Sequence, residues 1–134
     1  MNEAEDNTEG EELLGLNQRL LDAIAGGDWE VYSKLCDPGL TAFEPEACGH
    51  LVEGLDFHKF YFDLGGASGP CNTTMSSPNV WMLGPDAGVV SFVRLVQKVD
   101  ASGNPVTRHS EETRIWLRRD GKWKHVHFHR STFQ

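Results

Sequence analysis

The sequence predicts one α+β domain in which a strongly curved antiparallel sheet wraps around a long N-terminal helix. Apolar residues with helical spacing are confined to the first part of the chain, and almost everything after residue 70 has the alternation of long strands. The 134 residues leave no room for a second domain, yet a chain of this length can bury a core without disulfides or a structural metal. We expect the domain to cover residues 11–134, because residues 1–10 are polar and acidic and predict a disordered lead-in.

The predicted helices come first along the chain. From Glu11 onward a stripe of leucines indicates a helix that the glycines at 26–27 end. Asp28 is expected to cap a second, short helix that stops at a turn over residues 36–39.

The strands follow after a mixed segment. A short strand is expected at 40–44, then an aromatic-rich helix at 55–62 and a loop rich in Gly and Ser at 64–70. The remaining chain predicts four long strands, at 71–83, 88–99, 106–118 and 123–132.

Charge and composition exclude several classes of protein. The net charge of −8 comes mainly from the N-terminus, where six of the twenty acidic residues lie in the first twelve positions. Between Arg94 and Arg130 nine Lys and Arg residues accompany four Asp and Glu, but they alternate with apolar strand residues, which argues against nucleic-acid binding. The absence of a long apolar run or a basic, apolar leader predicts a cytoplasmic protein without membrane contact. Three cysteines without a C-x-x-C pair predict reduced thiols, and we expect no cofactor.

Two arginines share a strand face with apolar residues. Arg94 alternates in phase with Val90, Phe92 and Val96, and Arg130 alternates in phase with Val126 and Phe128. A third, Arg114, joins this face in only one register of the hairpin around Asp120-Gly121. A three-residue loop turns Arg114 toward Val126, whereas a two-residue loop turns it toward His127, and the sequence does not choose between them.

An arginine cluster on a concave sheet face would suit a carboxylate, because the planar guanidinium binds one through two hydrogen bonds. Any single one of these arginines could instead sit at a strand end and pair with Glu111 or Glu112. Since buried charges need partners, we expect Glu111 or Glu112 to neutralise part of the cluster in either case.

The histidines offer two further hypotheses. Alternation would place His125, His127 and His129 on one strand face, where two neighbouring imidazoles could bind zinc if a third ligand converged on them. The sequence supplies no such third ligand, so we expect no zinc there. His58 lies in an apolar run next to Asp56. It is either a core histidine or, together with Asp56, the general base of a small-molecule isomerase or dehydratase. The sequence has no nucleophile elbow, phosphate-binding loop or kinase signature. An enzyme needs a base within hydrogen-bond reach of its substrate, whereas three arginines offer binding without a proton acceptor, which disfavours the enzyme hypothesis.

A set of longer motifs is more specific than any of these patterns. They are Leu21–Ile24, Gly27–Trp29, Cys36–Ala47, Leu51–Gly54, Asp56–Phe62, Ser110–Arg114, Arg118–Trp123 and Val126–Ser131. In this order they resemble the association (hub) domain of calcium/calmodulin-dependent protein kinase II, and the resemblance extends from Glu12 to Ser131 almost without gaps.

The resemblance implies a cystatin-like fold of the nuclear transport factor 2-like type. It further implies an oligomerisation module whose dimers form two stacked rings, commonly dodecamers or tetradecamers, that hold kinase domains around their edge. Arg94, Arg114 and Arg130 would line a pocket near His58 and Glu112 for small carboxylates or kinase segments.

The assembly surfaces are expected at aromatic positions that one small domain would struggle to bury, namely Trp81, Trp116 and residues 57–62. The sequence contains no kinase motif and no basic amphipathic segment of the kind that binds calmodulin. Kinase activity and calmodulin binding would therefore belong to a longer chain or to a relative.

Overall fold

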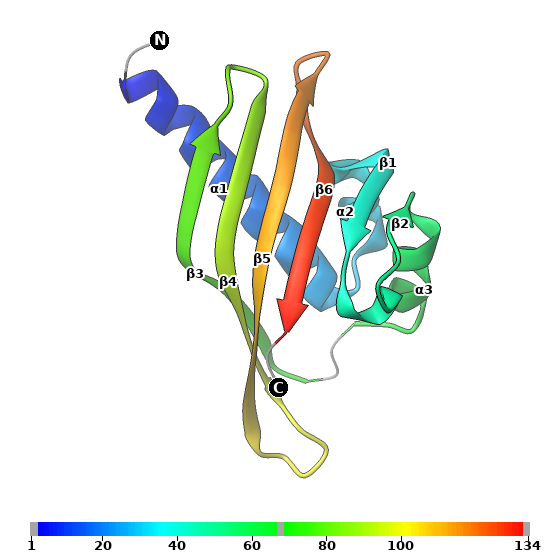
Figure 1. Cartoon of the computed structure of the whole chain (residues 1–134). Helices are drawn as coiled ribbons and strands as arrows, with labels where there is room; N and C mark the ends of the chain where they lie inside the picture. The colour runs from blue at the N-terminus through cyan, green and yellow to red at the C-terminus, as the bar shows by residue number, and fades with distance from the viewer. Residues whose placement is uncertain (1–2, 67–68, 133–134) are drawn as a thin grey trace.

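A six-stranded sheet curves around one long helix in the computed structural model, which describes residues 3–66 and 69–132 (Figure 1). The elements, in chain order, are α1 (Glu3–Gly26), α2 (Trp29–Leu35), β1 (Cys36–Phe43), the 3-10 helix η1 (Pro45–Ala47), β2 (Val52–Glu53), α3 (Asp56–Asp63), β3 (Cys71–Met82), β4 (Ala87–Val99), β5 (Pro105–Arg119) and β6 (Lys122–Thr132). The strand order is β2-β1-β6-β5-β4-β3, and only the β1–β6 pair is parallel. The predicted α+β class is confirmed.

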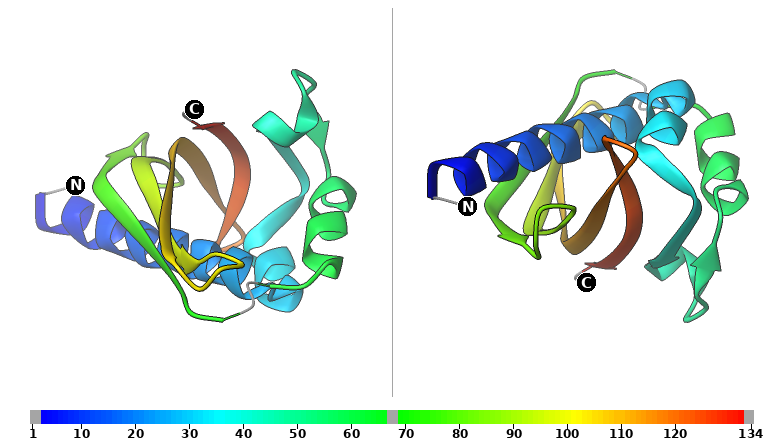
Figure 2. Two further views of the ribbon diagram at one scale, coloured as in Figure 1. Left: turned by 90° about the horizontal axis from the view of Figure 1, so that it is seen from below. Right: turned by 90° about the horizontal axis from the view of Figure 1, so that it is seen from above.

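Helix α1 lies along the concave side of the sheet, as the end-on views in Figure 2 show. Its buried side chains, Leu13, Asn17, Leu20, Leu21 and Ala23, follow the predicted stripe and join Val90, Phe92 and Trp116 in the core. Asn17 is the polar member of this stripe: its Oδ1 accepts a hydrogen bond of 3.1 Å from Trp116 Nε1 and its Nδ2 lies 3.2 Å from Met75 Sδ. Burial of this amide is therefore compatible with the core, because both of its polar ends have partners.

The start of α1 corrects the prediction of a disordered lead-in. The helix begins at Glu3 rather than Glu11, so residues 3–10 are helical, and Glu9 pairs with Arg118 at 3.4 Å. Helix α1 thus contacts the sheet through Glu9, before the leucine stripe begins. Residues 1–2 of the predicted lead-in, and 67–68 of the predicted loop, lie outside the described residues.

The predicted strands after residue 70 are confirmed with boundaries that differ by at most one residue. Helices α2 and α3 are also confirmed, and the Asp28 side chain caps α2 by accepting a hydrogen bond from the Val31 amide. The turn expected over residues 36–39 is wrong, since these residues belong to β1. Cys36 pairs with His125 of β6 and the register then shifts before Thr41, so Pro38 lies in a bulge where no amide donor is needed.

The β5–β6 hairpin combines a two-residue turn with a bulge. Arg119 pairs with Lys122 around Asp120 and Gly121, both of which have positive φ angles, as a tight type I′ turn requires. Further along, Ile115 pairs with His127 and Trp116 with His125, which leaves Val126 as the extra residue of a β-bulge. Arg114 consequently lies opposite Phe128, a partner that neither of the two expected registers provides.

No helix in residues 3–66 and 69–132 combines the length and the apolar character that crossing a bilayer would take.

Candidate functional site

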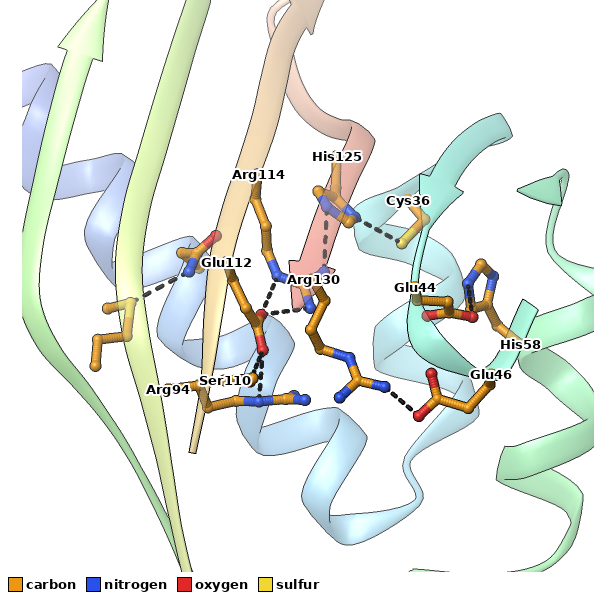
Figure 3. Close-up of polar contacts among 12 residues, drawn as sticks. Cys36, Glu44, Glu46, His58, Arg94, Ser110, Glu112, Arg114, His125 and Arg130 are labelled. Atoms are coloured by element: carbon orange, nitrogen blue, oxygen red, sulfur yellow. Dashed lines mark hydrogen bonds and ion pairs between the residues drawn. The ribbon is translucent and has the colours of Figure 1, made fainter. Parts of the chain in front are cut away.

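A cavity of about 300 Å³ opens between the concave face of the sheet and helices α2 and α3. We call it the arginine cavity, because Arg94 of β4, Arg114 of β5 and Arg130 of β6 all line it (Figure 3). His58 of α3 lines it as well, so the structure brings four of the five predicted pocket residues to one cavity. Its remaining walls are Ile24, Tyr32, Glu44, Glu46, Tyr61, Phe62 and Phe128.

Strand pairing places these residues in cross-strand rows. The rows on the concave face are Val90, Arg114 and Phe128; Phe92, Glu112 and Arg130; and Arg94, Ser110 and Thr132. Neighbours within a row lie about 5 Å apart and successive rows about 7 Å apart. A single carboxylate in the middle row is therefore within reach of arginines in both adjacent rows.

Glu112, the fifth predicted residue, is that carboxylate, and it lies beneath the cavity rather than in its wall. Its Oε1 accepts hydrogen bonds from Arg114, at 2.9 Å from Nε and 2.8 Å from Nη2. Its Oε2 lies 2.8 Å from Arg94 Nε and accepts a 2.8 Å hydrogen bond from Ser110 Oγ. The expected internal neutralisation is thus made by Glu112, whereas Glu111 is exposed on the other face.

Burial and charge shift the pKa values of this network in opposite ways. Burial alone would raise the pKa of Glu112, but Arg114, Arg94 and the Ser110 hydroxyl together hold it below its ordinary value of 4.5. Burial lowers the pKa of Arg94 to about 10, although Glu112 acts against this shift. Both groups are consequently charged at pH 7.

His125 extends the network into the core. Its Nε2 lies 3.4 Å from Arg114 Nη1, and its Nδ1 lies 3.5 Å from Cys36 Sγ. Burial, followed by the charge of Arg114, lowers the pKa of His125 well below 6.5, so the imidazole is neutral and its Nε2 can accept from the guanidinium. Burial also raises the pKa of Cys36 to about 12, which makes this thiol an unreactive partner.

The predicted face of three histidines is therefore wrong. His125 is fully buried on the concave side, while His127 hydrogen-bonds Thr41 at 2.7 Å and lies with His129 beside the Phe43 ring. The bulge at Val126 causes this difference, because one extra residue reverses the alternation between His125 and His127. The described residues contain no group of three or more metal-ligating side chains.

The outer wall of the cavity holds two carboxylates that the sequence reasoning missed. Glu46 of η1 forms an ion pair with Arg130, and Glu44 lies 3.3 Å from His58 Nε2. Glu44 alternates in phase with the buried Leu40 and Ala42, so the argument that located the arginines would have located it too. Glu46 follows Pro45 in the 3-10 helix, where strand alternation no longer applies.

The pairing of His58 with Asp56 is also corrected. Asp56 begins α3 and is exposed, outside the arginine cavity, and Glu44 is the carboxylate next to the imidazole. The His58 ring nitrogens are buried without a hydrogen bond to any described residue, since the contact with Glu44 has the distance of an ion pair but not the geometry of a hydrogen bond.

The three arginines have different freedom to bind a ligand. Arg114 has contacts from Nε, Nη1 and Nη2 to protein groups, and its guanidinium lies 4.2 Å above the Phe128 ring. Arg94 contacts Glu112 through Nε, and Arg130 contacts Glu46 through Nη2. Arg94 and Arg130 therefore have donors left for a carboxylate, while Arg114 organises the floor of the cavity.

Several known proteins are similar to this chain. The family model of the calcium/calmodulin dependent protein kinase II association domain matches residues 9–134. The chain belongs to this family. Its match to the delta subunit of calcium/calmodulin-dependent protein kinase type II from Oryctolagus cuniculus is 54% identical over 123 residues, or 90% of this chain and 23% of the relative. The chain thus spans less than a quarter of the length of that relative.

Solved structures extend the comparison. The association domain of C. elegans CaMKII is 46% identical, with a TM-score of 0.90 over 98% of this chain and 100% of that one. The C. reinhardtii CaMKII hub homology domain is 54% identical, with a TM-score of 0.85 over 92% of this chain and 97% of that one. A nuclear transport factor 2-like protein from Salmonella enterica shares the fold at 20% identity and a TM-score of 0.77, with 96% and 94% of the two chains covered. The predicted family and fold type are confirmed.

Substitution of Glu112 by glutamine should strongly destabilise the domain. The change leaves two buried guanidinium groups without a counter-charge, so we expect the free energy of unfolding to fall by about 3–5 kcal/mol. Glu111→Gln is the matched control, because it changes the neighbouring but exposed carboxylate. Equal stability of the two variants in urea unfolding would show that the buried network does not stabilise the fold.

The stability of the fold should fall as the pH is lowered, over a pH range set by the titration of His125. The folded pKa of His125 lies well below 6.5, so the unfolded chain binds a proton first, and stability is complete above pH 6.5 and falls below it. The depressed pKa of Glu112 adds a further loss below pH 4.5. Thermal midpoints at fixed protein concentration should fall between pH 7 and pH 5, and His125→Gln should flatten this slope. His127→Gln should retain most of the pH dependence of the thermal midpoint. An unchanged pH dependence in His125→Gln would show that His125 does not cause it.

Proposed function

We propose that this chain is an oligomerisation module that assembles into a closed, two-layered ring of dimers with ten or more subunits. The observation that carries the proposal is membership of the association-domain family over residues 9–134. The ring would organise kinase domains, either joined to the same chain in a longer protein or bound as partners. This segment itself is not expected to bind calmodulin.

Exposed apolar side chains support an assembly. Phe60 and Leu64 near α3, and Trp81 and Leu83 at the end of β3, are each more than half exposed. Trp81 and Leu83 line one surface groove together with Leu14 and Val80. Contiguous apolar surface of this kind marks interaction sites, and obligate interfaces are apolar. Trp116, which we also expected at an assembly surface, is instead fully buried against Asn17 in the core of the single chain.

We propose further that the arginine cavity binds a carboxylate. Free donors of Arg94 and Arg130 face a cavity whose other walls include Tyr32, Phe62 and Phe128, which suits an anion with an apolar body. The alternative, an isomerase or dehydratase, would use His58 and Glu44 as a base, because Asp56 lies outside the cavity. Binding of a carboxylate without turnover would favour the oligomerisation module. Turnover of a small molecule that is lost in His58→Gln would favour the isomerase or dehydratase.

Native mass spectrometry tests the assembly. At micromolar concentration we expect particles of ten or more subunits, and Trp81→Glu should reduce their mass because it places a charge on an apolar surface. Asn104→Glu is the control, since it adds the same charge at the tip of the β4–β5 hairpin. A wild-type protein that is only monomeric or dimeric would refute the proposal.

Calorimetric titration tests the cavity. Arg130→Gln should weaken the binding of a small hydroxy acid at least about tenfold with little loss of stability, because the ion pair it removes is with a partly exposed Glu46. Arg114→Gln should instead cause a large loss of stability, because Arg114 holds the floor of the cavity. Unchanged affinity in Arg130→Gln, or no binding of any carboxylate at millimolar concentration, would mean that the cluster is only a structural ion network.

A further inference from the structure

A second cavity, of about 380 Å³, adjoins the arginine cavity on the concave face. Arg94 and Arg130 line both cavities, so their guanidinium groups form the common wall. We call the second one the outer cavity. It is also lined by Arg108, and by the hydroxyl-bearing Ser110 and Thr132.

Strand register places Arg108 on the same face as the other arginines. Arg94 pairs with Ser110, and Val96 with Arg108, so Arg108 is two residue pairs beyond Glu112 along β5. Arg108 and Glu112 are four residues apart, so at about 3.3 Å per residue Arg108 lies roughly 13 Å from the Glu112 row, toward the loop end of the β4–β5 hairpin. Arginines thus continue along the concave face past the part that Glu112 neutralises.

The two cavities differ in their charge. The arginine cavity has Glu44 and Glu46 in its walls and Glu112 beneath it, so its arginines are matched by carboxylates. The outer cavity is lined by three arginines and, within the described part of the chain, by no Asp or Glu. Arg94 and Arg130 are already paired with Glu112 and Glu46, so the unmatched charge of the outer cavity is that of Arg108. This local excess of positive charge stands out in a chain whose net charge is −8.

We propose that the outer cavity binds a second carboxylate, so that the ligand of the paired cavities is a small molecule with two carboxylates. The inference rests on the proposed carboxylate site in the arginine cavity. Arg94 and Arg130 hold the first carboxylate from one side of the common wall and contribute donors to the second from the other side. Arg108 selects for the second carboxylate, because it is exposed and makes no ion pair with any described residue.

The test is calorimetric titration of the intact protein with succinate, glutarate and adipate. Each is compared with a monocarboxylate of the same chain length, namely butyrate, pentanoate and hexanoate. At least one dicarboxylate should bind about tenfold more tightly than its monocarboxylate, as one further charge-assisted interaction allows. The series also selects the chain length that spans the common wall.

Arg108→Gln should remove this advantage and leave the monocarboxylate affinity unchanged. Arg19→Gln is the matched control, since it removes one exposed positive charge of α1 that lines neither cavity. Equal affinities for the two classes of acid in the wild type, or an advantage that survives Arg108→Gln, would overturn the second site while the arginine cavity stands. Absence of binding by every acid in the series would overturn both.

Discussion

One buried carboxylate, that of Glu112, is the constraint on which the concave face depends. Its side chain is inaccessible to water and lies between Arg94 and Arg114, which come from the two rows on either side of its own. A guanidinium buried without a partner would cost several kcal/mol, and the apolar residues around it could not offset that cost. Because one carboxylate serves two arginines and a serine hydroxyl, the sheet can hold a polar floor within an otherwise apolar core.

The bulge at Val126 is the second structural condition. Without it, His127 would lie opposite Arg114, on the same concave face as His125. With it, His125 closes the network between Arg114 and Cys36, and His127 remains free to contact Thr41 on the other face. One unpaired residue thus assigns two neighbouring histidines to different chemical environments, one neutral in the core and one at the surface.

The sequence predicts features that depend on local alternation, but it does not predict features that depend on how the strands pair. Strands β3 to β6 were predictable because their alternation is long, and Arg94 and Arg130 because alternation places them with core residues. The face of Arg114 stayed open, because it depends on the hairpin register. The bulge was not predictable, since it depends on pairing between β5 and β6 rather than on local residue preference. For the same reason the turn signal at Pro38 was misleading: pairing of β1 with β6 overrides a local preference when the proline falls at a register shift. The contact of Glu9 with Arg118 was likewise not predictable, because it joins positions far apart in the chain.

The ion pairs around the arginine cavity differ in how readily they can separate. Glu112 cannot leave Arg114, because no water reaches either group, but Glu46 is partly exposed and can be solvated when it leaves Arg130. If the proposed carboxylate ligand displaced Glu46 as well as using the free donors of Arg94 and Arg130, a group of the same charge and geometry would take its place, and the electrostatics of the floor would change little. The change would fall on η1, the short segment between β1 and β2 that carries Glu46. Occupation of the proposed site would then be coupled to the edge of the sheet rather than to its core, and the network that holds the fold together would remain in place.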